Sequence, residues 1–291
     1  MDWLTNIKIP IGPWAKAAVD WLTTNGKGVF DFLQVVLKAC IDAILFVLQA
    51  PYLKNTPFES YYALGLIAVI SWLSWYLRKS AGVTLFTLLG LLLIYNQGYW
   101  AETMATLALV LAATGVSMAI GVPVGIASAR RPWLYSIIRP ILDLMQTIPT
   151  FVYLIPALIL FGLGMVPGLI ATVIFAIPAP IRLTRLGIIS TPPALVEAAE
   201  SFGATRQQVL RKVELPFAKP QIMAGLTQTI MLSLSMVVIA ALVGAPGLGV
   251  PVVRALNTVN IARGFEAGLC IVILAIILDR IFRSSDEGEQ A

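Results

Sequence analysis

The sequence predicts an all-α polytopic membrane protein with about seven transmembrane helices, preceded by an amphipathic helix at the membrane interface. Hydrophobic residues make up 58% of the 291 residues and charged residues 12%, whereas soluble domains average about 45–50% and about 25%. Most charged residues lie between long apolar segments. A soluble core could not bury so much apolar surface, so the chain requires a bilayer.

Residues 1–57 are predicted to form an N-terminal tail on the extracytoplasmic side, with an amphipathic helix over 28–49. The polar residues of that segment recur at helical intervals and leave a broad apolar face, which favours a helix lying in the interface. They are Asp31, Gln34, Lys38, Asp42 and Gln49. A transmembrane helix is the alternative, but Lys38 and Asp42 would each cost about 2.5–3.5 kcal/mol near the bilayer centre.

Residues 58–283 are predicted to form the transmembrane domain, and 284–291 a short cytoplasmic tail. Six spans are expected at about 61–77, 83–95, 103–129, 169–186, 221–243 and 265–282, and another rises from segment 133–147 to an outer turn at 162–168. The segment 83–95 is short, so its ends should extend into the flanking polar sequence. Pro149 and Pro156 should break or kink the span between 133 and 162.

The long polar segment 191–220 lies between two of these spans. Thr191 before two prolines indicates a capped helix start, and Gly203 indicates a helix end in the left-handed conformation. Thr205 and Gln208 have the spacing of a capping box, so a second helix should begin there. We expect it to run to about residue 213, where Pro216 stops it.

The two short helices of segment 191–220, which we call the elbow, carry too many charges to lie in lipid. The charged residues are Glu197, Glu200, Arg206, Arg211, Lys212 and Glu214. The elbow must therefore project into water or into a groove of another protein. A DNA-binding helix-turn-helix and a solvated loop are the alternatives, but apolar spans on both sides hold the segment against a bilayer.

The orientation follows from the positive-inside rule. With the elbow in the cytoplasm, the loops between spans and the end of the last span place thirteen Lys and Arg residues inside and two outside. The inner ones are Arg78, Lys79, Arg130, Arg131, Arg139, Arg182, Arg185, Arg206, Arg211, Lys212, Lys219, Arg280 and Arg283, and the outer ones are Arg254 and Arg263. The N-terminus is therefore expected outside and the C-terminus in the cytoplasm.

One motif in the elbow resembles a known family. Glu197-Ala198-Ala199, then Gly203, then Val213-Glu214-Leu215-Pro216 is similar to the EAA loop of ABC-importer permeases, with valine where isoleucine is commoner. By this resemblance Glu197, Ala198, Ala199, Gly203, Leu215 and Pro216 contact an ABC ATPase. The flanking segments 146–150 and 244–249 resemble the permeases of glycine betaine, proline betaine and choline importers, the ProW type.

The resemblance implies a type I ABC importer permease (MetI-like) fold in a bacterial inner membrane. It also implies a homodimer, a separate extracytoplasmic binding protein and ATP bound by the partner subunit. The expected function is import of a quaternary-ammonium compatible solute. A permease for another small solute such as methionine, and a membrane scaffold, are the alternatives.

The residues present argue against an enzyme, a metal protein or a nucleic-acid-binding protein. The chain has no histidine and no P-loop sequence, so it lacks the commonest general base and cannot be its own ATPase. Cys40 and Cys270 lie far apart in apolar sequence, where burial is the expected role. The net charge of +5 reflects orientation rather than nucleic acid. We expect no cofactor.

A substrate path is expected where spans are broken and small polar side chains occur. The candidates are Gln146, Thr147, Pro149, Tyr153, Ser233, Ser235 and Met236. Ordinary helix packing is the alternative for each of them. No preorganised aromatic cage for a quaternary ammonium is recognisable, so selection of the solute is expected to belong to the binding protein, with Phe151 and Tyr153 only assisting.

Overall fold

The computed structural model describes residues 10–50 and 58–283, and within them it is helical, without a strand. The first helices are α2 (Ile11–Asn25), α3 (Lys27–Gln49), α4 (Glu59–Arg78), α5 (Ala81–Asn96), α6 (Trp100–Arg130), α7 (Pro132–Thr147), α8 (Thr150–Phe161), α9 (Met165–Ala176) and α10 (Pro178–Ile189). They are followed by α11 (Pro193–Ser201), α12 (Arg206–Val209), a π-helical turn η2 (Leu210–Glu214), α13 (Leu215–Ser235), α14 (Val237–Ala241), α15 (Gly249–Asn257) and α16 (Ile261–Phe282). The expected tail 284–291 lies outside the described residues.

Among the described residues, four segments are long and apolar enough to cross a membrane, or five if a bent pair counts as one span. They are α4, α6, the consecutive helices α9 and α10, and α16, which match four of the predicted spans. Helix α5 has 16 residues, so at about 1.5 Å per residue it is shorter than a bilayer core of about 30 Å. Compared with the predicted segment 83–95, α5 includes only residues 81, 82 and 96 in addition, so the expected extension of its ends is small. The number of seven spans stays a prediction.

The span expected between 133 and 162 is not one continuous helix. Its halves α7 and α8 are bent by 96°. The break falls at Pro149, which stands immediately before the first residue of α8, as proline before a helix start allows. Pro156, expected to break or kink this span, lies inside α8 without ending it. The outer turn is also shorter than predicted, because α9 begins at Met165.

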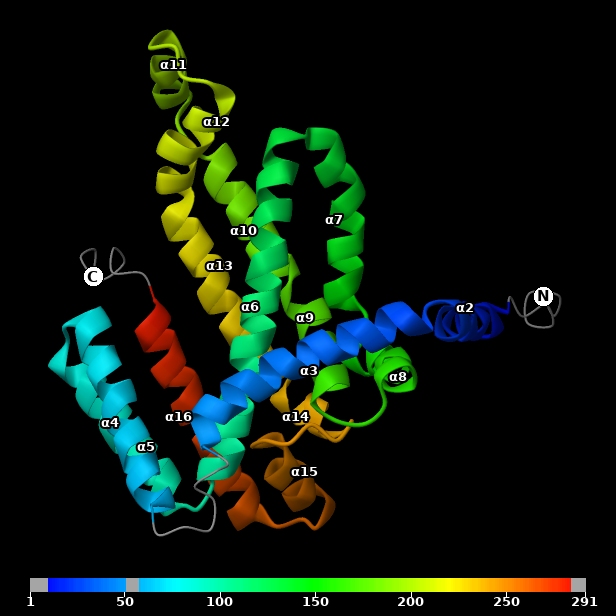
Figure 1. The fold of residues 1–291 in the computed structure, drawn as a ribbon, viewed down its shortest axis with the longest axis vertical. Coiled ribbons are helices and arrows are strands. Elements are labelled where there is room, and N and C mark those ends of the chain that lie inside the picture. The colour runs from blue at the N-terminus through cyan, green and yellow to red at the C-terminus, as the bar shows by residue number, and fades with distance from the viewer. Residues whose placement is uncertain (1–9, 51–57, 284–291) are drawn as a thin grey trace, which may run out of the picture.

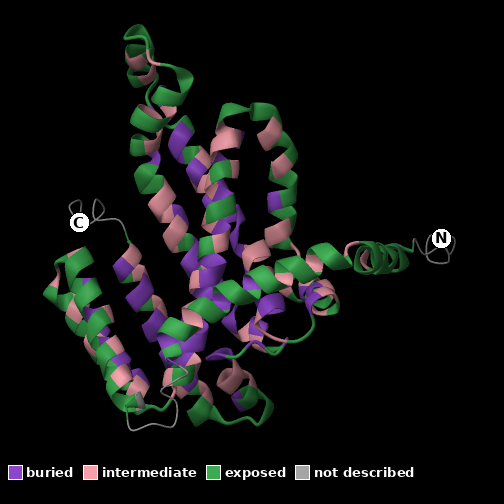
Figure 2. Ribbon diagram, in the orientation of Figure 1, coloured by how far each residue is buried: buried purple, intermediate pink, exposed green. Residues whose placement is uncertain are grey.

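Helix α6 occupies the centre of the bundle and packs against α10, α13, α9 and α3 (Figure 1). Buried residues concentrate where these helices meet, whereas α2 and the elbow are largely exposed (Figure 2). A Cβ atom built at Gly121 would come 2.7 Å from Pro180, and one at Gly125 would come 2.7 Å from Thr184. Because neither position has room for a Cβ, α10 lies directly on α6, as small residues permit in lipid.

Helix α3 confirms the predicted helix over 28–49 and crosses α6 at a steep angle in Figure 1. It buries one stripe, Leu37, Ile41 and Leu48. Two side chains of its polar face bind the body of the protein: the Gln34 amide donates to the Phe161 carbonyl at 3.3 Å, and the Gln49 amide donates to the Ala101 carbonyl at 2.9 Å.

The two cysteines lie in different environments, one exposed and one buried. Cys270 is buried as predicted, but Cys40 is exposed. The expectation of burial was wrong for Cys40 because α3 buries only the narrow stripe described above, and residue 40 lies beside that stripe. The two cysteines therefore remain free thiols in different surroundings.

Candidate coupling site and transport path

The elbow forms the tip of the molecule, with α11 and α12 at the end opposite α15 (Figure 1). Gly203 has φ +77°, the left-handed conformation predicted for it. Its N–H donates to the Glu200 carbonyl at 2.9 Å, and the Ala204 N–H donates to the Ala199 carbonyl at 3.0 Å. These two bonds satisfy carbonyls at the end of α11 and turn the chain toward α12.

The start of α12 also matches the prediction, but the start of α11 does not. Thr205 and Gln208 form the complete capping box. Helix α11, by contrast, begins after Pro192 without a side-chain cap. The Thr191 N–H still donates to the Ile188 carbonyl of α10 at 3.2 Å, and its hydroxyl is buried without a hydrogen-bond partner among the described residues. Thr191 therefore belongs to the end of α10, and Pro193 begins α11 because its missing N–H costs nothing there.

The second helix of the elbow does not stop at Pro216. Helix α12 continues through the π-helical turn η2 into α13, and the Leu215 N–H donates to the Leu210 carbonyl five residues back. The ring of a proline inside an α-helix meets the carbonyl four residues earlier, and a π-type turn widens the helix at that point. Pro216 then lies in the first turn of α13. The second helix of the elbow and α13 thus form one continuous helix.

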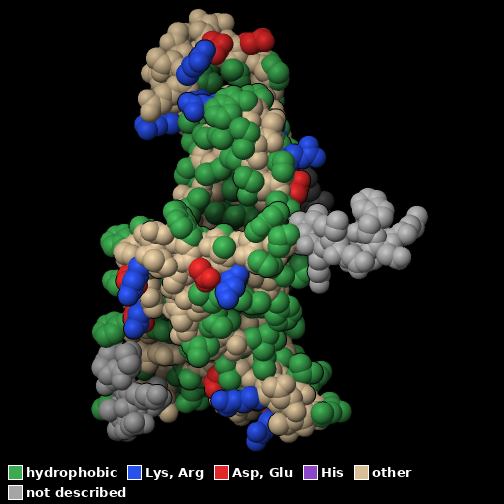
Figure 3. Space-filling view, turned by 90° about the vertical axis from the view of Figure 1, so that its right-hand side faces the viewer, with side chains coloured by type: hydrophobic (Ala, Val, Ile, Leu, Met, Phe, Trp, Pro, Cys, Tyr) green, Lys and Arg blue, Asp and Glu red, His purple; other side chains and the backbone are tan. Residues whose placement is uncertain are grey.

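The side chains predicted to contact the ATPase lie mainly on the outside of the elbow. Glu197, Ala198, Gly203 and Pro216 are exposed, and Ala199 and Leu215 are partly buried. Phe202, next to Gly203, is 93% exposed, which is unusual for a large apolar side chain. In Figure 3 basic and acidic side chains lie at this tip, and hydrophobic side chains cover much of the body below it.

The elbow is also tied to the end of α6. The Arg130 guanidinium lies 3.1 Å from a Glu214 carboxylate oxygen and donates to the Arg206 carbonyl at 2.9 Å. The sequence identifies Arg130 only as an inner flanking charge, because no local spacing relates it to residues 76 and 84 positions later. The elbow is therefore connected to the spans in three places: along the chain to α10 and α13, and through Arg130 to α6.

The first candidates for the substrate path, Gln146 and Thr147, lie at the end of α7. The Arg182 guanidinium of α10 donates to the Gln146 side-chain oxygen at 2.7 Å and to Asp143 at 2.6 Å. Thr147 donates to the Asp143 carbonyl at 2.9 Å. Near the start of α7, the Arg185 guanidinium lies 3.6 Å from the centroid of the Tyr135 ring. The polar side of α7 is thus engaged with α10 rather than free in a channel.

The remaining candidates divide into two groups. Tyr153 packs against an apolar cluster that contains the buried Met236, so the structure brings these two together. Ser233 is buried and donates to the Thr229 carbonyl at 2.8 Å, whereas Ser235 is exposed and donates to the Met231 carbonyl at 3.0 Å. Their hydroxyls are therefore used within α13, as in ordinary helix packing. The exposed Pro149 marks the bend before α8.

One contact near the predicted path has no local sequence signal. The Thr106 hydroxyl accepts from the Leu248 N–H at 2.8 Å. Gly247, with φ +141°, lies so close that a Cβ would come 2.6 Å from the same oxygen. The loop after α14 is thereby fixed against α6. Among residues 10–50 and 58–283, no group of three or more His, Cys, Asp or Glu side chains is placed to hold a metal ion.

The family model described as "Binding-protein-dependent transport system inner membrane component" matches residues 121–288. The glycine betaine transport system permease protein OpuAB of Bacillus subtilis is 46% identical over 274 residues, which cover 94% of this chain and 93% of that protein. The glycine betaine/proline betaine transport system permease protein ProW of Escherichia coli is 44% identical, over 94% of this chain and 74% of that protein.

Among solved structures, an inward-facing conformation of the MetNI methionine ABC transporter is similar to this fold. It superimposes with a TM-score of 0.56 at 26% identity and covers 62% of this chain and 92% of that chain. The match therefore covers nearly all of that chain and leaves more than a third of this one unmatched.

Proposed function

Because this chain belongs to the family of binding-protein-dependent transport system inner membrane components, we propose that it is the permease subunit of an ATP-driven importer of glycine betaine or a related quaternary-ammonium solute. Relatives named for glycine betaine transport are 43–46% identical over 94% of the chain, which confirms the resemblance drawn from the elbow and from segments 146–150 and 244–249. Choline is less directly supported, because it occurs in the name of a relative that is 34% identical over 56% of the chain.

The elbow is the observation that carries the mechanism. Membership of the family implies an ATPase and a substrate-binding protein as partners. The elbow is exposed and charged, and it continues into α13 and bonds to α6. A partner that binds ATP and closes on the elbow would move both helices together. ATP hydrolysis can drive transport only if such contacts differ in free energy between the two transporter states.

The orientation follows from the same assignment. With the elbow in the cytoplasm, the C-terminus lies in the cytoplasm and the N-terminus outside, in the bacterial inner membrane. The thirteen-to-two distribution of basic residues supports this arrangement. We further propose that two copies of the chain form a homodimer that encloses the path, with lipid around the exposed apolar side chains of α4 and α5.

Methionine transport is the nearest alternative, since the similar solved structures belong to a methionine transporter. Their identity of 25–26% is lower than that of the glycine betaine relatives. A scaffold without transport activity would not stimulate an ATPase.

The test is reconstitution of the chain in proteoliposomes with its ATPase and binding protein. We expect uptake of labelled glycine betaine that requires ATP and the binding protein, and that excess methionine does not inhibit. Methionine uptake, or the absence of any solute-stimulated ATP hydrolysis, would contradict the proposal.

A further inference from the structure

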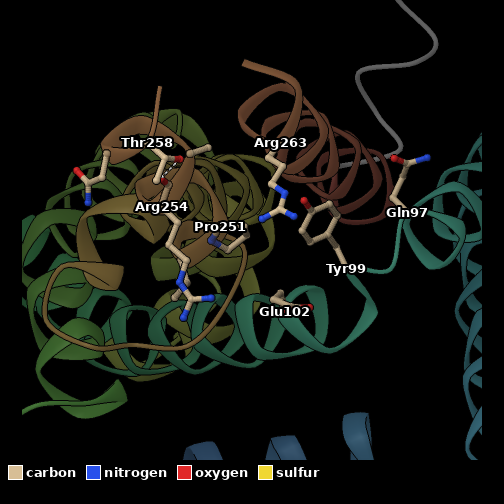
Figure 4. Close-up of a pocket in the computed structure, with 10 residues that line it drawn as sticks. Gln97, Tyr99, Glu102, Pro251, Arg254, Thr258 and Arg263 are labelled. Atoms are coloured by element: carbon tan, nitrogen blue, oxygen red, sulfur yellow. Dashed lines mark hydrogen bonds between the residues drawn. The ribbon is translucent and has the colours of Figure 1, made fainter. Parts of the chain in front are cut away.

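A cavity of about 570 Å³ lies at the end of the bundle opposite the elbow. Figure 4 shows side chains from four places in the chain around it: Gln97 and Tyr99 before α6, Glu102 in the first turn of α6, Arg254 in α15 and Arg263 in α16. The volume lies within the roughly 300–1,000 Å³ of small-molecule sites. With the elbow in the cytoplasm, this cavity opens on the extracytoplasmic side.

The basic residues of the cavity are unusual in their position. Arg254 and Arg263 are the two Lys or Arg residues that the predicted topology leaves in outer loops between spans, against thirteen inside. The positive-inside rule disfavours both. Although they are separated in sequence and lie on different helices, both line the same cavity. The orientation of the chain in the membrane therefore does not explain why these two arginines are present, whereas binding of a negatively charged ligand does.

Glu102 gives the cavity a charge of the opposite sign. The ion pairs within residues 10–50 and 58–283 involve other side chains, so neither arginine has a carboxylate within 4.0 Å, and Glu102 has no cation within that distance. In Figure 4 the Arg263 guanidinium lies beside the Tyr99 ring, and Arg254 extends toward the helix that carries Glu102. Charges of both signs thus surround one space without pairing across it, which suits a ligand that carries both signs itself.

Tyr99 adds an aromatic surface. Its hydroxyl lies 3.5 Å from a carboxylate oxygen of Glu266. Burial, and then the Glu266 charge, raises the pKa of Tyr99, so its hydroxyl stays neutral at physiological pH. A neutral phenol ring attracts a quaternary ammonium by cation–π interaction. A single ring, without an aromatic cage, binds a quaternary ammonium only weakly. Weak binding suits a site from which the solute must be passed on.

We propose that this cavity is a transient site for a zwitterionic solute, whose carboxylate binds Arg254 and Arg263 and whose quaternary ammonium lies against Tyr99 and Glu102. The inference rests on the proposed function, from which it takes its ligand. It adds that the permease itself holds the solute after the binding protein releases it. It also assigns a preference: a cation without a carboxylate, such as choline, leaves the arginines unused.

The experiment measures direct binding to the permease–ATPase complex in lipid nanodiscs without the binding protein, by saturation-transfer NMR on the methyl signals of the solute. We expect glycine betaine to bind more tightly than choline. Arg254→Gln and Arg263→Gln should each weaken glycine betaine binding by roughly 10- to 100-fold, as loss of a charged hydrogen bond does. Glu102→Gln should weaken both solutes. Arg280→Gln, the same change at the other end of α16, should have no effect.

Two parallel measurements separate the possible failures. If the wild type imports glycine betaine with its binding protein but the two arginine variants bind it directly as the wild type does, this inference is wrong and the proposed function stands. If those variants lose affinity for the binding protein while direct binding is unchanged, the cavity is a protein-docking surface and the inference is also wrong. If the wild type imports no betaine, the proposed function fails. Restoration of binding by Arg263→Lys would exclude misfolding as the cause.

Discussion

Substitution of Gly203 tests whether the left-handed turn of the elbow couples ATP hydrolysis to transport. Gly203 has φ +77°, and a Cβ built there meets no atom within 4 Å. Steric crowding therefore contributes nothing in the isolated subunit, and Gly203→Ala changes only the backbone preference. Placing a residue with a Cβ in the left-handed region costs about 1–2 kcal/mol. Such a difference changes a two-state ratio by about 5- to 30-fold.

Three substitutions at residue 203 distinguish an effect of backbone conformation from an effect of charge on the exposed surface. Asparagine and aspartate both tolerate the left-handed conformation better than alanine, and they differ from each other in charge. We expect Gly203→Asn to keep most of the coupled uptake and Gly203→Ala to lower it by up to about 5- to 30-fold. Gly203→Asp should abolish uptake, because it places a negative charge on the exposed surface that we propose the ATPase covers.

The assay is solute-stimulated ATP hydrolysis measured beside uptake in the same proteoliposomes. Size-exclusion chromatography should show that each variant is inserted and assembled, since the altered turn lies outside the packed core. Uptake by Gly203→Ala equal to that of the wild type would show that the left-handed turn is not required. Normal coupled transport by Gly203→Asp would show that the elbow is a passive loop.

Three further predictions follow from other contacts. Arg130→Gln and Glu214→Gln should each weaken coupled hydrolysis modestly, because the two side chains are 35% and 16% exposed and partly exposed pairs contribute about 0.2–1 kcal/mol. The double variant Arg130→Glu with Glu214→Arg should recover part of the loss. No recovery would mean that the pair does not act together. In a Cys40→Ala background, Asp31→Cys and Asn96→Cys should both react with an impermeant reagent from outside; reaction of Asp31→Cys from inside alone would reverse the predicted orientation. Exchange of the binding protein should change which solute is imported more than Tyr153→Leu or Phe151→Leu does, and an equal shift from these substitutions would place selection in the permease.

The elbow was the most predictable part of the structure, because its signals are local. The glycine at 203 and the capping box of Thr205 and Gln208 each depend on residues at most five positions apart, and both formed as expected. The prediction failed at Pro216, where proline was treated only as a stop. A π-helical turn accommodated it instead, and no sequence spacing distinguishes that outcome from a helix end.

The contacts that position the spans were not predictable in this way. Arg130 meets Glu214 across 84 residues, and Arg182 meets Asp143 across 39. Charge patterns predict the side of the membrane on which these residues lie but not their partners. The sequence predicts a proline break between α7 and α8 but not the bend of 96°, because a proline indicates where a helix bends and not by what angle. The roles of the path candidates likewise stay predictions.

The close approach of α10 to α6 has a mechanical consequence. No side chain at residues 121 and 125 separates these helices, and α10 also packs along α13. Helices that interlock in this way have two discrete arrangements at most and do not slide smoothly. We therefore expect α6, α10 and α13 to move together when the elbow is displaced. Helix α7 is held to α10 by the partly exposed Arg182 pair and by the Arg185–Tyr135 contact, and partly exposed pairs contribute only about 0.2–1 kcal/mol. We therefore expect α7 to separate from α10 more easily than α6 or α13 does.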